Sequence, residues 1–105
     1  MNEAAVAVNP TIDESSRPAL PRYARLQFDQ TRDRWVLLVP ERVMVPDETA
    51  VEVLQMCDGE RSLADIIDSL AEKYAADRET ISTDVVAMLR DLAERGFLVD
   101  AREEN

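Results

Sequence analysis

Cys57 is the residue of this chain best suited to covalent chemistry. It is the only cysteine among 105 residues, it lies in the stretch "EVLQMCDG", and the chain has no histidine. A thiol nucleophile usually needs a histidine as its base, so Cys57 lacks the common activating partner. A lone cysteine also forms no internal disulfide. We therefore favour the alternative that Cys57 is a small buried apolar side chain, late in a helix.

Metal, phosphate and acid–base sites are poorly supported by the residue types. Zinc, haem and iron–sulfur sites need several cysteine or histidine ligands. A phosphate-binding loop needs several glycines, and the chain has only Gly59 and Gly96. The 22 acidic residues show no paired-carboxylate signature and are typical of helix caps and solvated helix faces. We therefore expect a protein that is not an enzyme, with no catalytic residue, metal site or cofactor.

The charge of the chain restricts its partners. The net charge is −10, which argues against a nucleic-acid partner and against an anionic membrane surface. The N-terminus "MNEAAVAVNPTIDESS" lacks the basic and apolar regions of a signal peptide, so we expect a cytoplasmic protein. The charge is uneven, because residues 17–42 hold six arginines and three acidic residues, whereas residues 43–105 hold six basic and sixteen acidic residues. Such asymmetry can orient a protein partner.

The distribution of apolar residues predicts one domain with a tail at each end. Residues 1–21 contain three prolines and no sustained apolar period, so we interpret them as a flexible N-terminal tail or linker. Residues 100–105, "DAREEN", are interpreted as a flexible C-terminal tail. The domain itself is expected to span residues 22–99.

The first half of this domain carries strand patterns. Residues 24–29 alternate between apolar and polar side chains, residues 35–39 form a continuous apolar run, and residues 42–45 form a third short apolar segment. A polar turn separates the first two, and Pro40 with Glu41 interrupts the chain before the third. The pattern predicts a three-stranded antiparallel meander whose first two strands form a hairpin.

The second half carries three amphipathic helix patterns, each with a start signal. Asp47, Ser62 and Asp77 are expected helix caps, and the first and third helices are expected to end at Asp58-Gly59 and Gly96. Residues 97–99, "FLV", are suited to a short extended piece against the sheet. We predict an α+β fold, a three-stranded antiparallel sheet followed by a three-helix bundle, which resembles a winged helix.

The third strand and the third helix stand out within this fold. Arg42 and Met44 point to one face of the strand and Val43 and Val45 to the other, and no later strand is clearly assigned to cover its edge. An uncovered apolar edge is an aggregation hazard unless another element shields it. In the third helix the apolar arc is wider than a core contact needs. Core packing is favoured for Ile81, Val85, Met88 and Leu92, and a groove wall for Val86, Leu89 and Ala93.

The segments "RLQFD", "RWVLLVPERVMVPDETAVEVLQMCDGERSLADIIDSLAEKY" and "LAERGFLVD" resemble the PqqD family of pyrroloquinoline quinone biosynthesis. The resemblance covers about residues 20–100, and the block "RWVLLVPERV" followed by "CDG" is its most specific part. The family resembles the recognition domains that bind leader peptides of ribosomally made, post-translationally modified peptides. In some relatives this domain is fused to another enzyme of the pathway.

The resemblance implies a peptide chaperone or adaptor without catalytic activity. Such a domain binds the precursor peptide PqqA and presents it to the radical S-adenosylmethionine enzyme PqqE. The leader is expected to add as a strand beside the third strand, in a groove walled by the third helix. The residues implied in peptide binding are Arg42, Val43, Met44, Val45, Val85, Val86, Leu89 and Ala93.

Two other functions remain open at this point. A winged-helix nucleic-acid-binding domain has a loosely similar order of elements, but the third helix carries acidic residues against a similar number of arginines, which suits a phosphate backbone poorly. A general protein-interaction domain is the other alternative. Binding to duplex DNA would favour the first alternative.

Overall fold

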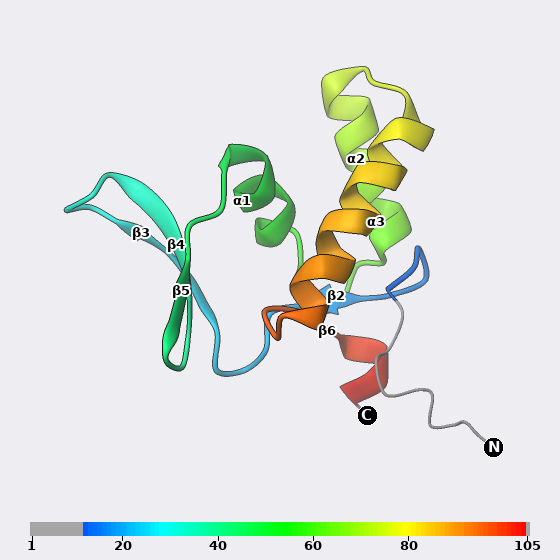
Figure 1. Cartoon of the computed structure of the whole chain (residues 1–105). Coiled ribbons are helices and arrows are strands. Elements are labelled where there is room, and N and C mark those ends of the chain that lie inside the picture. Colours follow the sequence, from blue (N-terminus) through cyan, green and yellow to red (C-terminus); the bar gives the residue numbers. More distant parts are fainter. Residues whose placement is uncertain (1–11, 105) are drawn as a thin grey trace.

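The computed structural model describes residues 12–104 and shows an α+β fold, which confirms the predicted class. The described chain forms a three-stranded sheet, three α-helices and a separate pair of short strands, arranged as in Figure 1. In chain order the elements are β2 (Pro18–Ala19), β3 (Arg25–Asp29), β4 (Arg34–Val39), β5 (Arg42–Met44), α1 (Glu48–Gln55), α2 (Leu63–Tyr74), α3 (Arg78–Glu94), β6 (Val99–Asp100) and the 3-10 helix η1 (Ala101–Glu104).

The three-stranded sheet is the predicted antiparallel meander, with strand order β3-β4-β5. In the first hairpin the Asp29 carboxylate accepts hydrogen bonds from the backbone N–H groups of Thr31 (3.0 Å) and Arg32 (3.2 Å), which shapes the loop. The second hairpin turns through only Pro40 and Glu41, and Glu41 has a positive φ of 67°. Proline followed by a positive-φ residue is the pattern of a type II turn.

The helices begin at the predicted caps. The side chains of Asp47, Ser62 and Asp77 accept hydrogen bonds from the N–H groups three residues later, at 2.8, 3.1 and 3.0 Å. The end of α1 differs from the expectation, because the helix ends at Gln55 and Cys57 lies just beyond it. Cys57 is nevertheless buried, as expected.

Gly96 ends α3 as predicted. Its φ is +84°, and the N–H of Phe97 donates to the carbonyl of Leu92 at 2.9 Å. A left-handed residue followed by such a backward hydrogen bond closes the last turn of a helix, and glycine adopts this conformation at the lowest cost.

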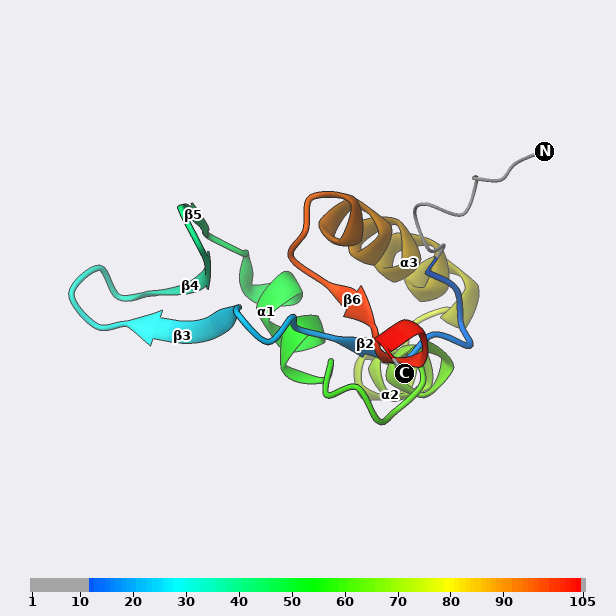
Figure 2. The same cartoon turned by 90° about the horizontal axis from the view of Figure 1, so that it is seen from below.

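The core lies where the inner face of the sheet meets the helices. α1 lies between the three-stranded sheet and the α2–α3 pair, as two views of the molecule show (Figures 1 and 2). The core side chains come from all of these elements: Ile12, Leu37, Val39, Val53, Leu54, Cys57, Leu63, Ile66, Ile67, Leu70, Val85, Leu89, Leu92, Phe97 and Leu98.

The folded domain extends beyond the expected boundaries of residues 22–99. Ile12 is a core residue, and β2 pairs with β6 in an antiparallel ladder, so that residues 12–21 and residues 100–104 pack onto the domain. The sequence lacked a signal for this because both strands contain only two residues. Residues 97–99 likewise differ from the expectation, because Val99 pairs with β2 and not with the three-stranded sheet. Residues 1–11 of the expected tail lie outside the described part of the chain.

Candidate functional site

β5 lies at the edge of the three-stranded sheet, and no other strand within residues 12–104 pairs with its outer side. Among the described strands it pairs only with β4, in the register Leu37 to Met44, Leu38 to Val43 and Val39 to Arg42. In an antiparallel hairpin with a two-residue turn, the pair next to the turn exchanges both backbone hydrogen bonds, and the next pair does not. The N–H and C=O groups of Val43 therefore point away from β4 and are placed to receive another strand.

The two faces of β5 have different surroundings. Arg42 and Met44 pair with buried residues of β4 and share their face, and Met44 packs against the core. Val43 and Val45 alternate with them and are 63% and 49% exposed. The face with Arg42 and Met44 is therefore the one turned toward the helices, a choice that the sequence alone left open.

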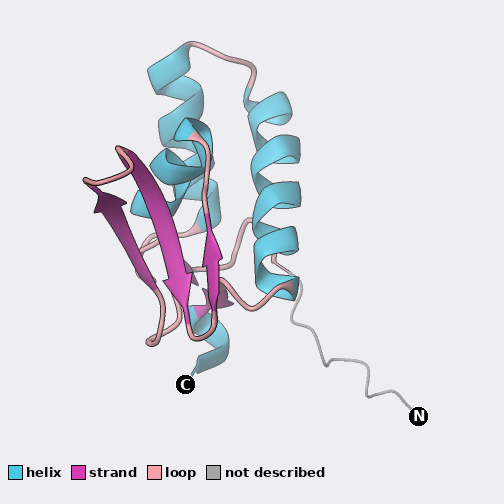
Figure 3. Ribbon diagram, turned by 60° about the vertical axis from the view of Figure 1, so that its left-hand side comes forward, coloured by secondary structure: helices cyan, strands magenta, loops and turns pink. Residues whose placement is uncertain are grey.

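α3 lies on the side of the sheet where β5 forms the edge, and β3 is the strand farthest from it (Figures 2 and 3). Val86 and Ala93 of α3 are partly buried against the core and keep some accessible surface. Val85 and Leu89 lie in the core, and Leu89 is 0% exposed. Leu89, interpreted above as a groove wall, is thus a core residue of the free protein.

Phe97 follows the end of α3 and contacts Arg42 of β5, and it is not among the site residues predicted from the sequence. The guanidinium carbon of Arg42 lies 4.7 Å from the centroid of the Phe97 ring, and that of Arg95 lies 5.4 Å from it. A Cβ atom at Gly96 would lie 3.2 Å from a terminal nitrogen of Arg42, so the glycine leaves room for the guanidinium. The only sequence signal for this cluster was an aromatic residue directly after a helix-ending glycine.

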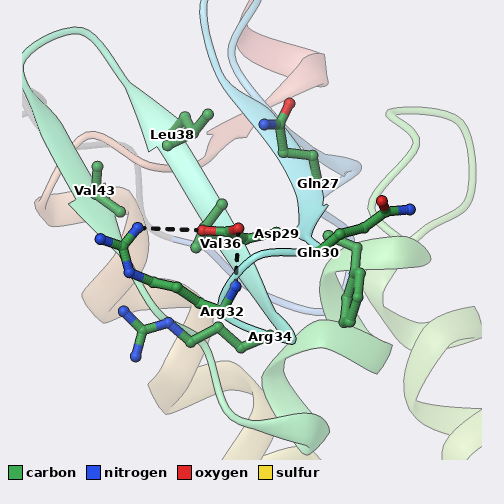
Figure 4. Close-up of a pocket in the computed structure, with 9 residues that line it drawn as sticks. Gln27, Asp29, Gln30, Arg32, Arg34, Val36, Leu38 and Val43 are labelled. Carbon is green, nitrogen blue, oxygen red and sulfur yellow. Dashed lines mark hydrogen bonds and ion pairs between the residues drawn. The ribbon is translucent and has the colours of Figure 1, made fainter.

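A shallow hollow of about 510 Å³ lies on the outer face of the sheet, opposite to the helices. Figure 4 shows Val36, Leu38 and Val43 along it, with Arg32 and Arg34 at its side. Arg32 forms an ion pair with Asp29 at 3.5 Å. Apart from Val43, this hollow contains none of the residues implied in peptide binding.

The described residues also bear on covalent and metal chemistry. Burial, with a smaller contribution from the charge of Asp58, raises the pKa of the Cys57 thiol to about 12. The thiol donates to the carbonyl of Val53 at 3.3 Å, as expected for a packing residue rather than a nucleophile. Within residues 12–104, no group of three or more cysteine, aspartate or glutamate side chains is placed to hold a metal ion. None of the helices in this part is both long and apolar enough to cross a membrane.

Comparisons with known proteins agree on one family. Residues 34–98 match the family described as coenzyme PQQ synthesis protein D (PqqD). The chain is 66% identical over 95 residues to the PqqA binding protein of Rhodopseudomonas palustris (strain BisB5), which covers 90% of this chain and 93% of that protein. It is 47% identical over 88 residues to the PqqA binding protein of Xanthomonas oryzae pv. oryzae (strain KACC10331 / KXO85), which covers 84% and 96%.

Two solved structures are similar to this fold. One is the solution NMR structure of the PqqD truncation of Methylobacterium extorquens PqqCD, described as a functional, stand-alone recognition element for ribosomally synthesized and post-translationally modified peptides. It has a TM-score of 0.71, 40% identity, and coverage of 87% of this chain and 98% of that one. The other is the crystal structure of PqqD from Xanthomonas campestris, with a TM-score of 0.50, 46% identity, and coverage of 81% and 94%. The family match and these relatives show that this chain belongs to the PqqD family.

Proposed function

We propose that this chain is a non-catalytic adaptor that binds the precursor peptide PqqA by strand addition at β5 and presents it to the radical enzyme PqqE. The open edge at Val43 is the observation that carries the proposal, because its backbone groups have no partner strand among the described residues. The names of the relatives support PqqA as the ligand. The similarity to a structure described as a peptide recognition element supports the mode of binding.

The geometry of β5 assigns different roles to backbone and side chains. An added strand gains affinity from main-chain hydrogen bonds with Val43, which depend little on peptide sequence. Every second peptide side chain then points to the face shared by Arg42 and Met44, and we propose Val86 and Ala93 of α3 as the facing wall. Selectivity is therefore expected from the peptide side chains on this face. Met44 suits such a site because its flexible thioether adapts to different partners.

Presentation to PqqE requires a second surface that stays accessible while the peptide is bound. Holding the peptide on an adaptor that also binds the enzyme raises the local concentration of the peptide at the active site. The acidic faces of α1 and α2 lie outside the proposed peptide groove, and we propose them as this second surface on the basis of their charge.

The edge-strand mechanism is tested by replacing Val43 with proline. Proline removes the outward N–H group and fits an edge strand at a position that does not donate to its neighbour. We expect the affinity for a synthetic PqqA peptide, measured by calorimetry, to fall about tenfold or more, as the loss of one or two backbone hydrogen bonds predicts. The Val43→Ala variant keeps the N–H group and is expected to lose much less.

A complementary experiment leaves the protein unchanged. A PqqA peptide methylated at single backbone amides should lose affinity at alternate positions only, because alternate amides of an added strand face β5. Unchanged binding by both the Val43→Pro variant and all methylated peptides would contradict strand addition at this edge. Backbone amide spectra of the variant show whether the domain remains folded.

A further inference from the structure

We propose that Arg42 and Arg95, held against Phe97, form a subsite that binds one carboxylate of the docked peptide and so determines its register on β5. This inference rests on the proposed function, since it concerns the same groove. Beyond the proposed function, it identifies one chemical group of the peptide that the chain recognises, which is an acidic side chain or the C-terminal carboxylate. It also identifies the residues that bind this carboxylate.

The first observation is the arrangement of two cations on one ring. The guanidinium carbons of Arg42 and Arg95 lie 4.7 and 5.4 Å from the centroid of Phe97. Phe97 is only 2% exposed and is fixed in the core. A guanidinium that rests on an aromatic face is held in place by the ring while its N–H groups stay available for hydrogen bonds. The ring therefore orders both arginines before any ligand arrives.

The second observation is that only one of the two guanidinium groups forms an ion pair within residues 12–104. Arg95 forms an ion pair with Asp91 at 3.0 Å, one helical turn earlier. Arg42 forms no ion pair in this part of the chain, so no contacting carboxylate neutralises its charge. A bound anion would relieve the repulsion between the two guanidinium groups. A carboxylate is the group that a planar guanidinium binds best, through two parallel hydrogen bonds.

The third observation is that the absence of a side chain at Gly96 leaves space for the Arg42 guanidinium. Gly96 has a φ of +84°, and a Cβ atom there would come within 3.2 Å of the Arg42 guanidinium. The hydroxyl of Tyr23, an exposed residue, donates to the carbonyl of Gly96 at 3.4 Å. Gly96 therefore leaves space for the Arg42 guanidinium beside the Phe97 ring.

The fourth observation places the cluster on the path of an added strand. Arg42 begins β5 and shares the groove face with Met44. A residue directly opposite Arg42 on an added strand would have its Cβ about 4.5–5.5 Å from that of Arg42 and on the same face. An acidic residue at that position reaches the guanidinium. A slip of one residue would turn the acid to the outer face, so the ion pair selects one register.

The test is a coupling experiment between peptide carboxylates and arginines. The probe is a synthetic PqqA peptide in which each acidic residue is replaced in turn by its amide, together with a form amidated at the C-terminus. Each is titrated into the wild-type chain and into the Arg42→Gln and Arg95→Gln variants. The control is Arg34→Gln, which removes the same charge from an arginine beside the hollow on the outer face.

We expect one amide replacement to weaken binding to the wild-type chain about tenfold, the size of a charge-assisted hydrogen bond. The same replacement should have no further effect in Arg42→Gln, and Arg42→Lys should restore part of the loss. An effect confined to the C-terminally amidated peptide identifies the terminal carboxylate as the ligand.

Two results would overturn the inference while leaving the proposed function intact. The first is an equal loss for every amide replacement in the wild-type chain and in Arg42→Gln. The second is an Arg34→Gln variant that behaves like Arg42→Gln, which would point to bulk charge. Failure of the unmodified peptide to bind the wild-type chain would instead overturn the proposed function together with this subsite.

Discussion

Asp100 is a carboxylate that is only 2% exposed and remains charged. Burial by itself raises the pKa of this group. Hydrogen bonds from the Arg102 side chain, the backbone N–H of Arg17 and the Ser16 hydroxyl outweigh burial and lower the pKa to about 2. The N–H of Arg17 lies 3.0 Å from one carboxylate oxygen, and a terminal nitrogen of Arg102 lies 2.7 Å from the other. Asp100 therefore joins the two ends of the described chain.

This lowered pKa predicts how stability depends on pH. A carboxylate with a folded-state pKa below its unfolded value stabilises the folded state above the unfolded pKa, and this contribution is lost as pH falls through the folded pKa. The free energy of unfolding of the wild-type chain should therefore exceed that of Asp100→Asn by a constant amount above about pH 4. The difference should shrink toward pH 2.

Urea titrations of both proteins between pH 2 and pH 7 measure this difference. Asp84→Asn, which replaces an exposed carboxylate on α3, serves as the control for loss of a charge. A difference between wild type and Asp100→Asn that stays constant down to pH 2 would contradict the assigned hydrogen bonds.

At the level of elements, residues 12–19 form a strap that crosses the start of α2 and runs along α3. The backbone carbonyls of Glu14 and Ser16 accept hydrogen bonds from the first N–H groups of α2, at 2.9 and 2.8 Å. The Glu14 carboxylate accepts two hydrogen bonds from Arg78, at 3.1 and 2.9 Å. The Arg90 side chain donates to the carbonyl of Ile12 at 2.8 Å. The strap thus satisfies helix-end donors that a helix cannot satisfy internally.

The strap makes a prediction about truncated chains. A chain that starts at Arg22 lacks Ile12, β2 and these hydrogen bonds, and is expected to be less stable than a chain that starts at Thr11 by about 3 kcal/mol or more, since burying one large aliphatic side chain is worth about that much. Ile12→Ala in the full chain should lose about 2–4 kcal/mol. Chemical denaturation of the three proteins checks this. Equal stability of the two truncated chains would show that residues 12–21 contribute nothing to the fold.

At the level of the whole molecule, charge separates the sheet from the helices. The six arginines of residues 17–42 lie in or beside the three-stranded sheet and β2, whereas the helical half of the chain is strongly acidic. An uneven charge distribution orients a partner during encounter and depends on salt. It also disfavours a nucleic-acid partner at α3, whose exposed surface includes Glu79, Asp84 and Asp91.

The proposed enzyme-binding surface is tested by charge reversal. Glu48 and Glu72 are exposed on α1 and α2. The double variant Glu48→Lys, Glu72→Lys is expected to weaken association with PqqE about tenfold at low salt and less at high salt, because surface charges mainly change the encounter rate. Its affinity for PqqA should not change. The control Glu79→Lys, Asp84→Lys makes the same charge change on α3.

Equilibrium and kinetic measurements of PqqE binding at two salt concentrations distinguish a docking surface on α1 and α2 from a general effect of net charge. Unaltered association of the α1–α2 variant with PqqE would eliminate these faces as the docking surface. Equal weakening by the α3 variant would mean that only the net charge matters.

The parts of this fold that could be predicted from the sequence are those that depend on neighbouring residues. Caps, alternation and helical periodicity depend on residues within a few positions of one another, so the three strands, the helix starts at Asp47, Ser62 and Asp77, and the end at Gly96 were predicted correctly. The open edge of β5 also followed from the order of the elements. The family resemblance was confirmed by the comparisons.

Only the tertiary structure decided which side chains are accessible and which distant segments meet. Leu89 and Val86 have similar apolar character, yet Leu89 is fully buried and Val86 is not, because this depends on how α3 packs against its neighbours. Asp100 meets the N–H of Arg17 across 83 positions of sequence, and Arg42 of β5 meets Phe97, which follows α3. Local sequence patterns do not report such partners, since contacts between distant segments form only when the whole core packs.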